Sequence, residues 1–190
     1  MSEEVDRIYA RRVGPPLSQR ELIGLLNSAL EPRDVIVCAA GSLPGDLHKL
    51  WRTHDPKGYH LEYGYSCMGY EIAGGLGVKM ADSSREVYVL VGDGSYLMMA
   101  QEIITSLQEN LRLNIVLLDN HGLSSIGGLS RACASGGFGI EYRYRDSVRP
   151  GEIIDVDFAA NASSLGVTYE QLAEALVNTR RQPQSSVVVV

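Results

Sequence analysis

Cysteine, positive charge and long apolar runs are all scarce in this sequence, and each absence narrows the class of protein. The three cysteines, Cys38, Cys67 and Cys133, are widely spaced and lack a metal-ligand pattern, so we expect free thiols in the reducing cytoplasm. Lysine and arginine number 17 against 23 aspartates and glutamates, and the net charge of −6 argues against a nucleic-acid partner. No apolar run is long enough to cross a bilayer and no signal-peptide pattern is present, so neither a membrane span nor secretion is expected.

What the sequence does contain is an alternation of apolar β-type runs with helical patterns. Hydrophobic residues make up 45% of the 190 residues and no repeats occur, which fits one α/β domain with a sizeable core. Strands are expected at 34–40, 87–91, 113–118, 167–168 and 185–190, and helices at 18–30, 70–81, 96–110, 157–165 and 169–180. The alternation predicts a doubly wound, mainly parallel sheet of about six strands with helices on both faces.

The two ends depart from this alternation. Residues 1–17 are charged and end near Gly14-Pro15-Pro16, which is typical of a linker or arm, so the domain is expected to span residues 18–190. The chain stops within the apolar run 187–190, in an expected buried strand. We therefore expect a piece of a longer protein, and the alternative is a natural C-terminus in an edge strand.

The most informative stretch is the Gly-Asp-Gly-Ser of residues 92–95. It follows the apolar run 87–91, and the next expected strand ends at Asn120-His121-Gly122. Parallel strands joined by a right-handed crossover end at one sheet edge, where open α/β sheets bind ligands. The oxygens of Asp93, Asn120 and a carbonyl near Gly122 suit Mg²⁺, and the N-terminus of the next helix favours an anion. The pattern predicts a diphosphate bridged to the protein by Mg²⁺, with an ordinary βαβ turn as the alternative.

This pattern resembles the motif of thiamine diphosphate-dependent enzymes, in which Gly-Asp-Gly is followed one crossover later by Asn. The resemblance implies thiamine diphosphate and Mg²⁺ as cofactors, with the metal held by Asp93, Asn120 and the Gly122 carbonyl. It also implies that Met68 props the cofactor in its bent form and that the Ser66 carbonyl accepts from the aminopyrimidine, although Met68 could serve core packing alone. The residues expected at the cofactor are Gly41, Ser42, Ser66, Met68, Gly92, Asp93, Gly94, Ser95, Asn120 and Gly122.

Two other glycine-rich stretches are expected close to this site. Residues 40–45 follow the first strand and predict a small-residue turn at the same sheet edge, near the phosphates or the substrate, unless they form a plain turn. Gly74, Gly75 and Gly77 lie inside the helical pattern 70–81 rather than directly after a strand, so they are not a dinucleotide fingerprint. They predict close packing of that helix on the sheet.

The candidate substrate-binding residues are three histidines, one serine and the arginines of a long segment. His48, His60 and His121, together with Ser42, are candidates, although a surface or structural role is the alternative for each histidine. Residues 123–155 are expected to form a loop over the substrate. Its arginines could orient an oxygenated substrate: Arg131, Arg143, Arg145 and Arg149.

Longer runs at 39–51, 67–75 and 119–131 resemble the ring-opening hydrolases of this superfamily, which act on trihydroxycyclohexane-1,2-dione in bacterial inositol catabolism. The resemblance implies hydrolysis of the C–C bond between the two carbonyls of a cyclic polyol dione by a homo-oligomeric enzyme. The activating glutamate of the family lies on a separate pyrimidine-binding domain or subunit, and Glu102, on the crossover helix, is better explained as structural.

We therefore expect the isolated chain to be inactive and to bind the cofactor weakly. Two other functions stay open. One is the β subunit of a split thiamine diphosphate-dependent 2-oxoacid decarboxylase, which would pair with a second chain. The other is a non-catalytic flavodoxin-like binding domain, which would bind neither Mg²⁺ nor thiamine diphosphate.

Overall fold

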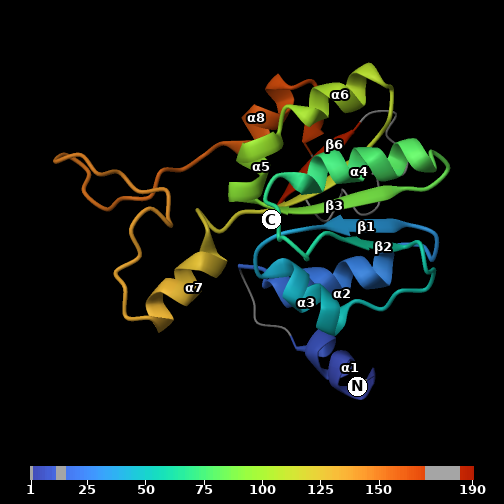
Figure 1. Cartoon of the computed structure of the whole chain (residues 1–190), viewed down its shortest axis with the longest axis horizontal. Coiled ribbons are helices and arrows are strands. Elements are labelled where there is room, and N and C mark those ends of the chain that lie inside the picture. The colour runs from blue at the N-terminus through green and yellow to red at the C-terminus, as the bar shows by residue number, and fades with distance from the viewer. Residues whose placement is uncertain (1, 12–15, 170–184) are drawn as a thin grey trace.

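The computed structural model describes residues 2–11, 16–169 and 185–190. A parallel six-stranded sheet runs through its centre in the order β2-β1-β3-β4-β6-β5 (Figure 1). The strands are β1 (Val35–Cys38), β2 (Tyr59–Leu61), β3 (Val87–Gly92), β4 (Asn114–Leu118), β5 (Thr168–Tyr169) and β6 (Ser186–Val189). The sequence order reverses around β1 and β3, so the predicted doubly wound parallel sheet is confirmed.

Helices cover both faces of the sheet, as predicted (Figure 1). On one face lie α4 (Tyr70–Ala81), α5 (Asp93–Met99), α6 (Glu102–Gln108) and α8 (Phe158–Ser164). On the other lie α2 (Gln19–Ala29) and α3 (Leu43–Leu50), with α1 (Ser2–Ala10) packed beside them. α7 (Ser124–Ala132) and the segment after it extend away from the sheet.

The apolar runs of the central strands explain the two cores. In β3, Val87, Val89 and Val91 belong to the core under α4 and α5, whereas Tyr88 and Leu90 belong to the core under α2 and α3. Successive strand side chains point to opposite faces, so a strand that is covered on both faces must be apolar at every position. The unbroken apolar run therefore indicated a central strand correctly.

Of the three glycines predicted to pack α4 on the sheet, Gly75 does so, whereas a β-carbon on Gly74 would meet Tyr70 of the same helix and one on Gly77 would meet open space. A β-carbon on Gly75 would lie 2.4 Å from Cγ2 of Val89, which is too close for any side chain.

The first helix of the predicted domain is also as expected, because Ser18 and Glu21 form a capping box at the start of α2.

The predicted helix at 96–110 is wrong as a single element. The chain forms α5, which begins at Asp93, and α6, which begins at Glu102. Between them the N–H groups of Ile103 and Ile104 donate to the carbonyls of Ala100 and Gln101, at 3.1 and 2.9 Å. These three-residue spacings tighten the chain and separate the two helices. The apolar spacing continues across the break, which is why the pattern predicted one helix.

Three further elements differ from the sequence-based expectation. β2 and α3 fall where residues 40–60 predicted turns and irregular chain. α7 occupies the first third of the expected loop 123–155. The rest of that loop is irregular, with two antiparallel bridges, Gly122 to Glu141 and Arg143 to Ile153. The helix predicted at 169–180 lies outside the described residues except for Tyr169, which belongs to β5.

The expected N-terminal arm contains helix α1. Val5 is buried in the core under α2, and the Tyr9 hydroxyl donates to the Leu50 carbonyl. Arg52 pairs with Asp6 at 2.8 Å. These contacts attach α1 to the sheet domain. A transmembrane helix is not found in the described ranges, where every helix is too short or too polar to cross a bilayer.

Candidate functional site

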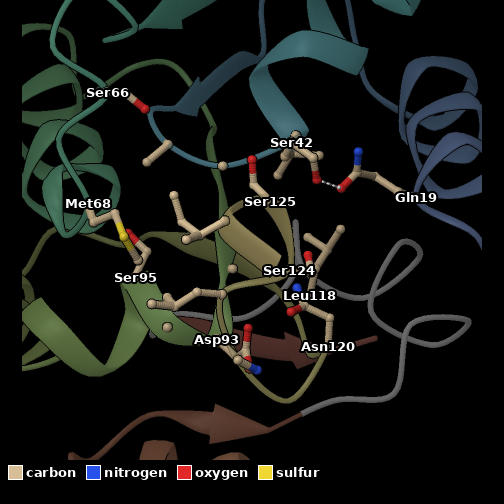
Figure 2. Close-up of a pocket in the computed structure, with 18 of the residues that line it drawn as sticks. Gln19, Ser42, Ser66, Met68, Asp93, Ser95, Leu118, Asn120, Ser124 and Ser125 are labelled. Atoms are coloured by element: carbon tan, nitrogen blue, oxygen red, sulfur yellow. Dashed lines mark hydrogen bonds between the residues drawn. The ribbon is translucent and has the colours of Figure 1, made fainter. Parts of the chain in front are cut away.

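A cavity of about 300 Å³ lies at the carboxyl ends of β1, β3 and β4 (Figure 2), a size typical of small-ligand sites. All residues predicted at the cofactor line it. The full lining is Gln19, Ala40, Gly41, Ser42, Leu43, Tyr63, Ser66, Met68, Gly92, Asp93, Gly94, Ser95, Leu118, Asn120, Gly122, Leu123, Ser124, Ser125, Ile126 and Leu129. The structure thus gathers into one cavity the residues that the motif and the resemblance had selected from distant parts of the chain.

Asp93 is the buried carboxylate of this cavity. It is the first residue of α5 and is 0% exposed. Its Oδ2 accepts the Gly122 N–H at 2.7 Å, whereas Oδ1 is buried with no hydrogen-bond partner among the described residues. Burial raises the pKa of Asp93 despite the lowering effect of the backbone N–H groups, of which Gly122 is the strongest. A cation beside Oδ1 would satisfy this atom, so the residues present fit a metal ion.

Asn120 leaves the sheet beside Asp93. Gly92 pairs with Leu118 in the parallel ladder, so the residues that follow the two strands emerge next to each other. Asp93 and Asn120 accordingly lie at the same end of the cavity in Figure 2. No group of three or more His, Cys, Asp or Glu side chains suited to a metal occurs in the described ranges. One carboxylate, one amide and one carbonyl instead match a cation that shares its coordination with phosphate oxygens and water.

Gly122 is held by a second segment of the chain. Its φ is +150°, and a β-carbon there would lie 2.2 Å from the Ile140 carbonyl oxygen, so only glycine fits. Leu123 N–H donates to Ile140 at 2.7 Å, and Tyr142 N–H donates to His121 at 3.0 Å. The loop after β4 is therefore fixed in place by residues 140–142.

Glu71 is a second buried carboxylate beside the cavity, and sequence reasoning missed it. It is 1% exposed. Oε1 accepts the Ala40 N–H at 3.2 Å, and Oε2 accepts the Gly69 N–H at 3.1 Å and the Ser95 hydroxyl at 2.6 Å. Glu71 thereby joins three segments around the cavity. The available signal was an acidic residue in the first turn of the mainly apolar helix α4.

The side chain of Ser95, one of the residues expected at the cofactor, is hydrogen-bonded within the protein. Its hydroxyl donates to Glu71 and accepts from the Gly69 N–H at 2.6 Å. That hydroxyl proton is committed to the protein, so a contact between Ser95 and a bound anion would have to come from the backbone.

Ser66 and Met68 lie on the approach to α4. Ser66 has a left-handed backbone with φ of 53°, a conformation that costs energy for a residue with a side chain. Glu62 holds this turn by accepting the N–H groups of Cys67 at 2.8 Å and Tyr65 at 3.0 Å, and these bonds lower its pKa. Cε of Met68 lies 3.5 Å from the point a β-carbon on Gly94 would occupy. Met68 thus packs at the cavity wall, against the Gly-Asp-Gly turn.

None of the candidate histidines lines the cavity. His48 lies edge-on to the rings of Tyr59 and Tyr63, and His60 is an exposed residue of the edge strand β2. His121 lies on the loop after β4, where its Nδ1 is 3.3 Å from Oδ1 of Asp119. Of the three, His121 is the one adjacent in sequence to lining residues.

The candidate arginines also lie outside the cavity lining. Arg143 contacts Glu141 and the Gly151 carbonyl at 2.5 Å, while the guanidinium groups of Arg145 and Arg149 stack on Phe138 and Tyr144. The outer wall is instead apolar and comes from α7, through Ile126 and Leu129, which are 52% and 64% exposed. Also in the lining, Ser42 donates to Gln19 at 3.3 Å (Figure 2).

Comparison with known proteins agrees with this geometry. The family model "Thiamine pyrophosphate enzyme, C-terminal TPP binding domain" matches residues 39–190. Proteins named 3D-(3,5/4)-trihydroxycyclohexane-1,2-dione hydrolase from Bacillus thuringiensis (strain Al Hakam) and Bacillus cereus (strain AH820) are each 48% identical over 189 residues, which is 95% of this chain. The chain spans 29% of the length of these relatives.

Two solved structures share the fold. They are the thiamine diphosphate-dependent 4-hydroxybenzoylformate decarboxylase of Rhodococcus jostii RHA1 and the benzoylformate decarboxylase of Polynucleobacter necessarius. Each has a TM-score of 0.81 and matches 95% of this chain, at 19% and 17% sequence identity. This chain covers 33% and 34% of theirs. With the family model matched over most of its length, the chain belongs to the thiamine pyrophosphate enzyme family, in which it corresponds to the C-terminal TPP-binding domain.

Proposed function

We propose that this chain is the cofactor-binding domain of a thiamine diphosphate-dependent hydrolase that cleaves the C–C bond between the two carbonyls of trihydroxycyclohexane-1,2-dione, a step of inositol catabolism. The observation that carries the cofactor assignment is the unpartnered Oδ1 of buried Asp93, at a sheet edge shared with Asn120 and Gly122. The substrate assignment is supported by relatives of that name at 48% identity. Membership of the family argues against the flavodoxin-like alternative.

The residues of the cavity suit a Mg²⁺–diphosphate at one end and an organic ring at the other. Asp93, Asn120 and the Gly122 carbonyl would hold Mg²⁺, because hard oxygens are its preferred ligands. Met68 and the Ser66 carbonyl would hold the pyrimidine of the cofactor. Bound thiamine diphosphate supplies an electron sink for breaking a C–C bond beside a carbonyl.

The apolar wall of α7 would shield this chemistry. Ile126 and Leu129 line the cavity while much of each side chain is exposed. In the proposal, the missing pyrimidine-binding domain covers this wall, contributes the activating glutamate and belongs to a homo-oligomeric protein. The chain spans only 29% of its relatives, and we therefore expect no turnover by the isolated domain. A cytoplasmic location is part of the proposal, since Cys38, Cys67 and Cys133 are all free thiols.

The test of the cofactor assignment is titration calorimetry of the 190-residue chain with Mg²⁺ and thiamine diphosphate. We expect weak binding that requires Mg²⁺, and we expect Asp93→Ala to abolish it because the only charged ligand is lost. The matched control is Asp146→Ala, which removes an exposed carboxylate whose contacts are confined to residues 148 and 149. Equal binding by wild type and Asp93→Ala would contradict the assignment.

The test of the substrate assignment uses the full-length protein. We expect the full-length protein to open the ring of trihydroxycyclohexane-1,2-dione to an acid. Mass spectrometry of the reaction mixture detects this product. Turnover of a 2-oxoacid with no reaction of the dione would overturn this assignment in favour of a decarboxylase. Measurable turnover of the dione by the isolated chain would overturn the expectation that a second domain is required.

A further inference from the structure

The segment 140–142 reaches the cofactor site through its backbone. It pairs with the loop after β4 by the bonds from Leu123 N–H to Ile140 and from Tyr142 N–H to His121. A third bond, from the Ile154 N–H to the Tyr142 carbonyl at 2.7 Å, holds Tyr142 from its other side. The Tyr142 backbone is therefore held beside the loop after β4.

The side chain of Tyr142 ends beside the Gly-Asp-Gly turn. Its hydroxyl lies 3.3 Å from the point that a β-carbon on Gly94 would occupy. The oxygen is buried and has no hydrogen-bond partner in the described part of the chain. Burial raises the pKa of Tyr142 to about 12, with Asp93 and Asp119 contributing. Even at the ordinary tyrosine pKa of about 10, this hydroxyl is a protonated donor at neutral pH.

A hydrogen-bond acceptor and a hydrogen-bond donor, both buried and without a partner among the described residues, thus occur near the Gly-Asp-Gly turn. Oδ1 of Asp93 is a buried acceptor, and the hydroxyl of Tyr142, close to the adjacent Gly94, is a buried donor. Buried polar groups in native proteins are nearly always paired, and those that are not call for a specific explanation. A cation on Oδ1 that carries oxygen ligands of its own would satisfy both atoms together.

We propose that Tyr142 is an additional binding residue of the cofactor site, whose hydroxyl donates a hydrogen bond to an oxygen in the coordination sphere of the cation held by Asp93. That oxygen belongs either to the diphosphate or to a metal-bound water. The inference rests on the proposed function, because it needs a metal at Asp93. It gives the segment after α7 a role in cofactor binding.

The experiment compares two tyrosines whose hydroxyls are both buried and unpartnered. Tyr142→Phe removes the hydroxyl beside Gly94. Tyr59→Phe removes one at the start of β2, which β1 separates from β3 and the turn that follows it. In thermal melts without ligand we expect both variants to match or slightly exceed wild type, because each loses an unpaired buried hydroxyl. With Mg²⁺ and thiamine diphosphate, we expect calorimetry to show about tenfold weaker binding for Tyr142→Phe and wild-type binding for Tyr59→Phe.

The choice of ligand distinguishes the two oxygens. Weaker binding of Mg²⁺ with inorganic pyrophosphate, but unchanged binding of Mg²⁺ alone, would assign the hydroxyl to a phosphate oxygen. Weaker binding of Mg²⁺ alone would assign it to a metal-bound water, and both results support the proposal. Equal cofactor binding by Tyr142→Phe and wild type would overturn it, as would a lower unliganded melting temperature with unchanged binding. No Mg²⁺-dependent binding by wild type would instead overturn the proposed function, and this inference with it.

Discussion

Two buried carboxylates lie beside one cavity, and their surroundings are opposite. Glu71 accepts hydrogen bonds from Ala40, Gly69 and Ser95 through both of its oxygens. Asp93 accepts through Oδ2 but leaves Oδ1 buried and unpartnered among the described residues. Both occur in the first turn of a helix packed on the same face of the sheet. Their helical context therefore does not account for the difference.

The difference separates a structural group from a binding group. A buried carboxylate whose oxygens both accept hydrogen bonds from the protein can contribute to the stability of the fold. A buried carboxylate oxygen without a donor lowers that stability, and such atoms occur where a bound ligand interacts with them. Glu71 joins the segments that form the cavity, and Asp93 is left to interact with what enters it. This comparison can be tested by substituting each carboxylate and by disturbing the loop that holds Asp93.

The largest effect on stability is expected at Glu71. Glu71→Ala leaves the Ala40 N–H and the Ser95 hydroxyl without their acceptor and removes one of the two acceptors of the Gly69 N–H. We expect a loss of about 3 kcal/mol in the free energy of unfolding, or a melting temperature lower by about 10 °C. Asp93→Ala should leave the stability without ligand unchanged or raised, because its loss removes a buried unpartnered atom. Thermal melts without ligand measure both effects.

The conservative variant serves as control at this position. Glu71→Gln retains one acceptor oxygen, so its stability should fall between those of wild type and Glu71→Ala. If instead Asp93→Ala destabilised the unliganded chain as strongly as Glu71→Ala, the distinction between the two carboxylates would be lost.

A smaller effect is expected at Gly122, which connects Asp93 to the segment 140–142. Gly122→Ala places a β-carbon on the Ile140 carbonyl, and we expect about 2 kcal/mol of lost stability together with weaker cofactor binding. Gly128→Ala is the control, since that glycine lies in α7 with open space around its α-carbon, and it should stabilise by about 0.5–1 kcal/mol. Chemical denaturation measures both, and a tolerated Gly122→Ala would show that the pairing is not needed.

The sheet and its helices could be predicted because short stretches of sequence specify each element. The apolar run of β3 and the capping box of α2 each specify their element within a few residues. The sequence did not predict β2, because it is a three-residue edge strand that contains the exposed residue His60. The sequence did not predict α3, because Pro44 and a glycine near its start resemble a turn. Proline is nevertheless tolerated in the first turn of a helix.

The site could be predicted where it follows the motif or the family resemblance. Asp93, Asn120 and Gly122 are recognisable because they occupy the first few positions after the ends of β3 and β4. Glu71 and Tyr142 take their roles from atoms that are distant in sequence, such as the Ser95 hydroxyl and the Gly94 backbone. No short pattern marks such residues, and they were recognised from burial and hydrogen bonding in the folded chain.

The smallest expected effect is a dependence on pH that follows from Asp93. Its folded pKa lies above the ordinary value of about 3.9, so the folded chain holds this proton at pH values where the unfolded chain has released it. The stabilisation is therefore complete below the ordinary pKa and is lost as the pH rises through the raised one. Binding of Mg²⁺ and the cofactor should change in the opposite direction, weakening as the pH falls through the raised pKa, by at most about tenfold per pH unit.

Calorimetry and thermal melts at several pH values between about 4 and 7 measure both trends. The Asp93→Ala chain is the control for stability, because it should lose the part of the dependence due to this carboxyl while retaining that of every other group. Binding that stays constant down to pH 4 would mean that the carboxylate ionises normally in the folded chain. The Oδ1 of Asp93 that lacks a partner among the described residues would then no longer indicate a ligand.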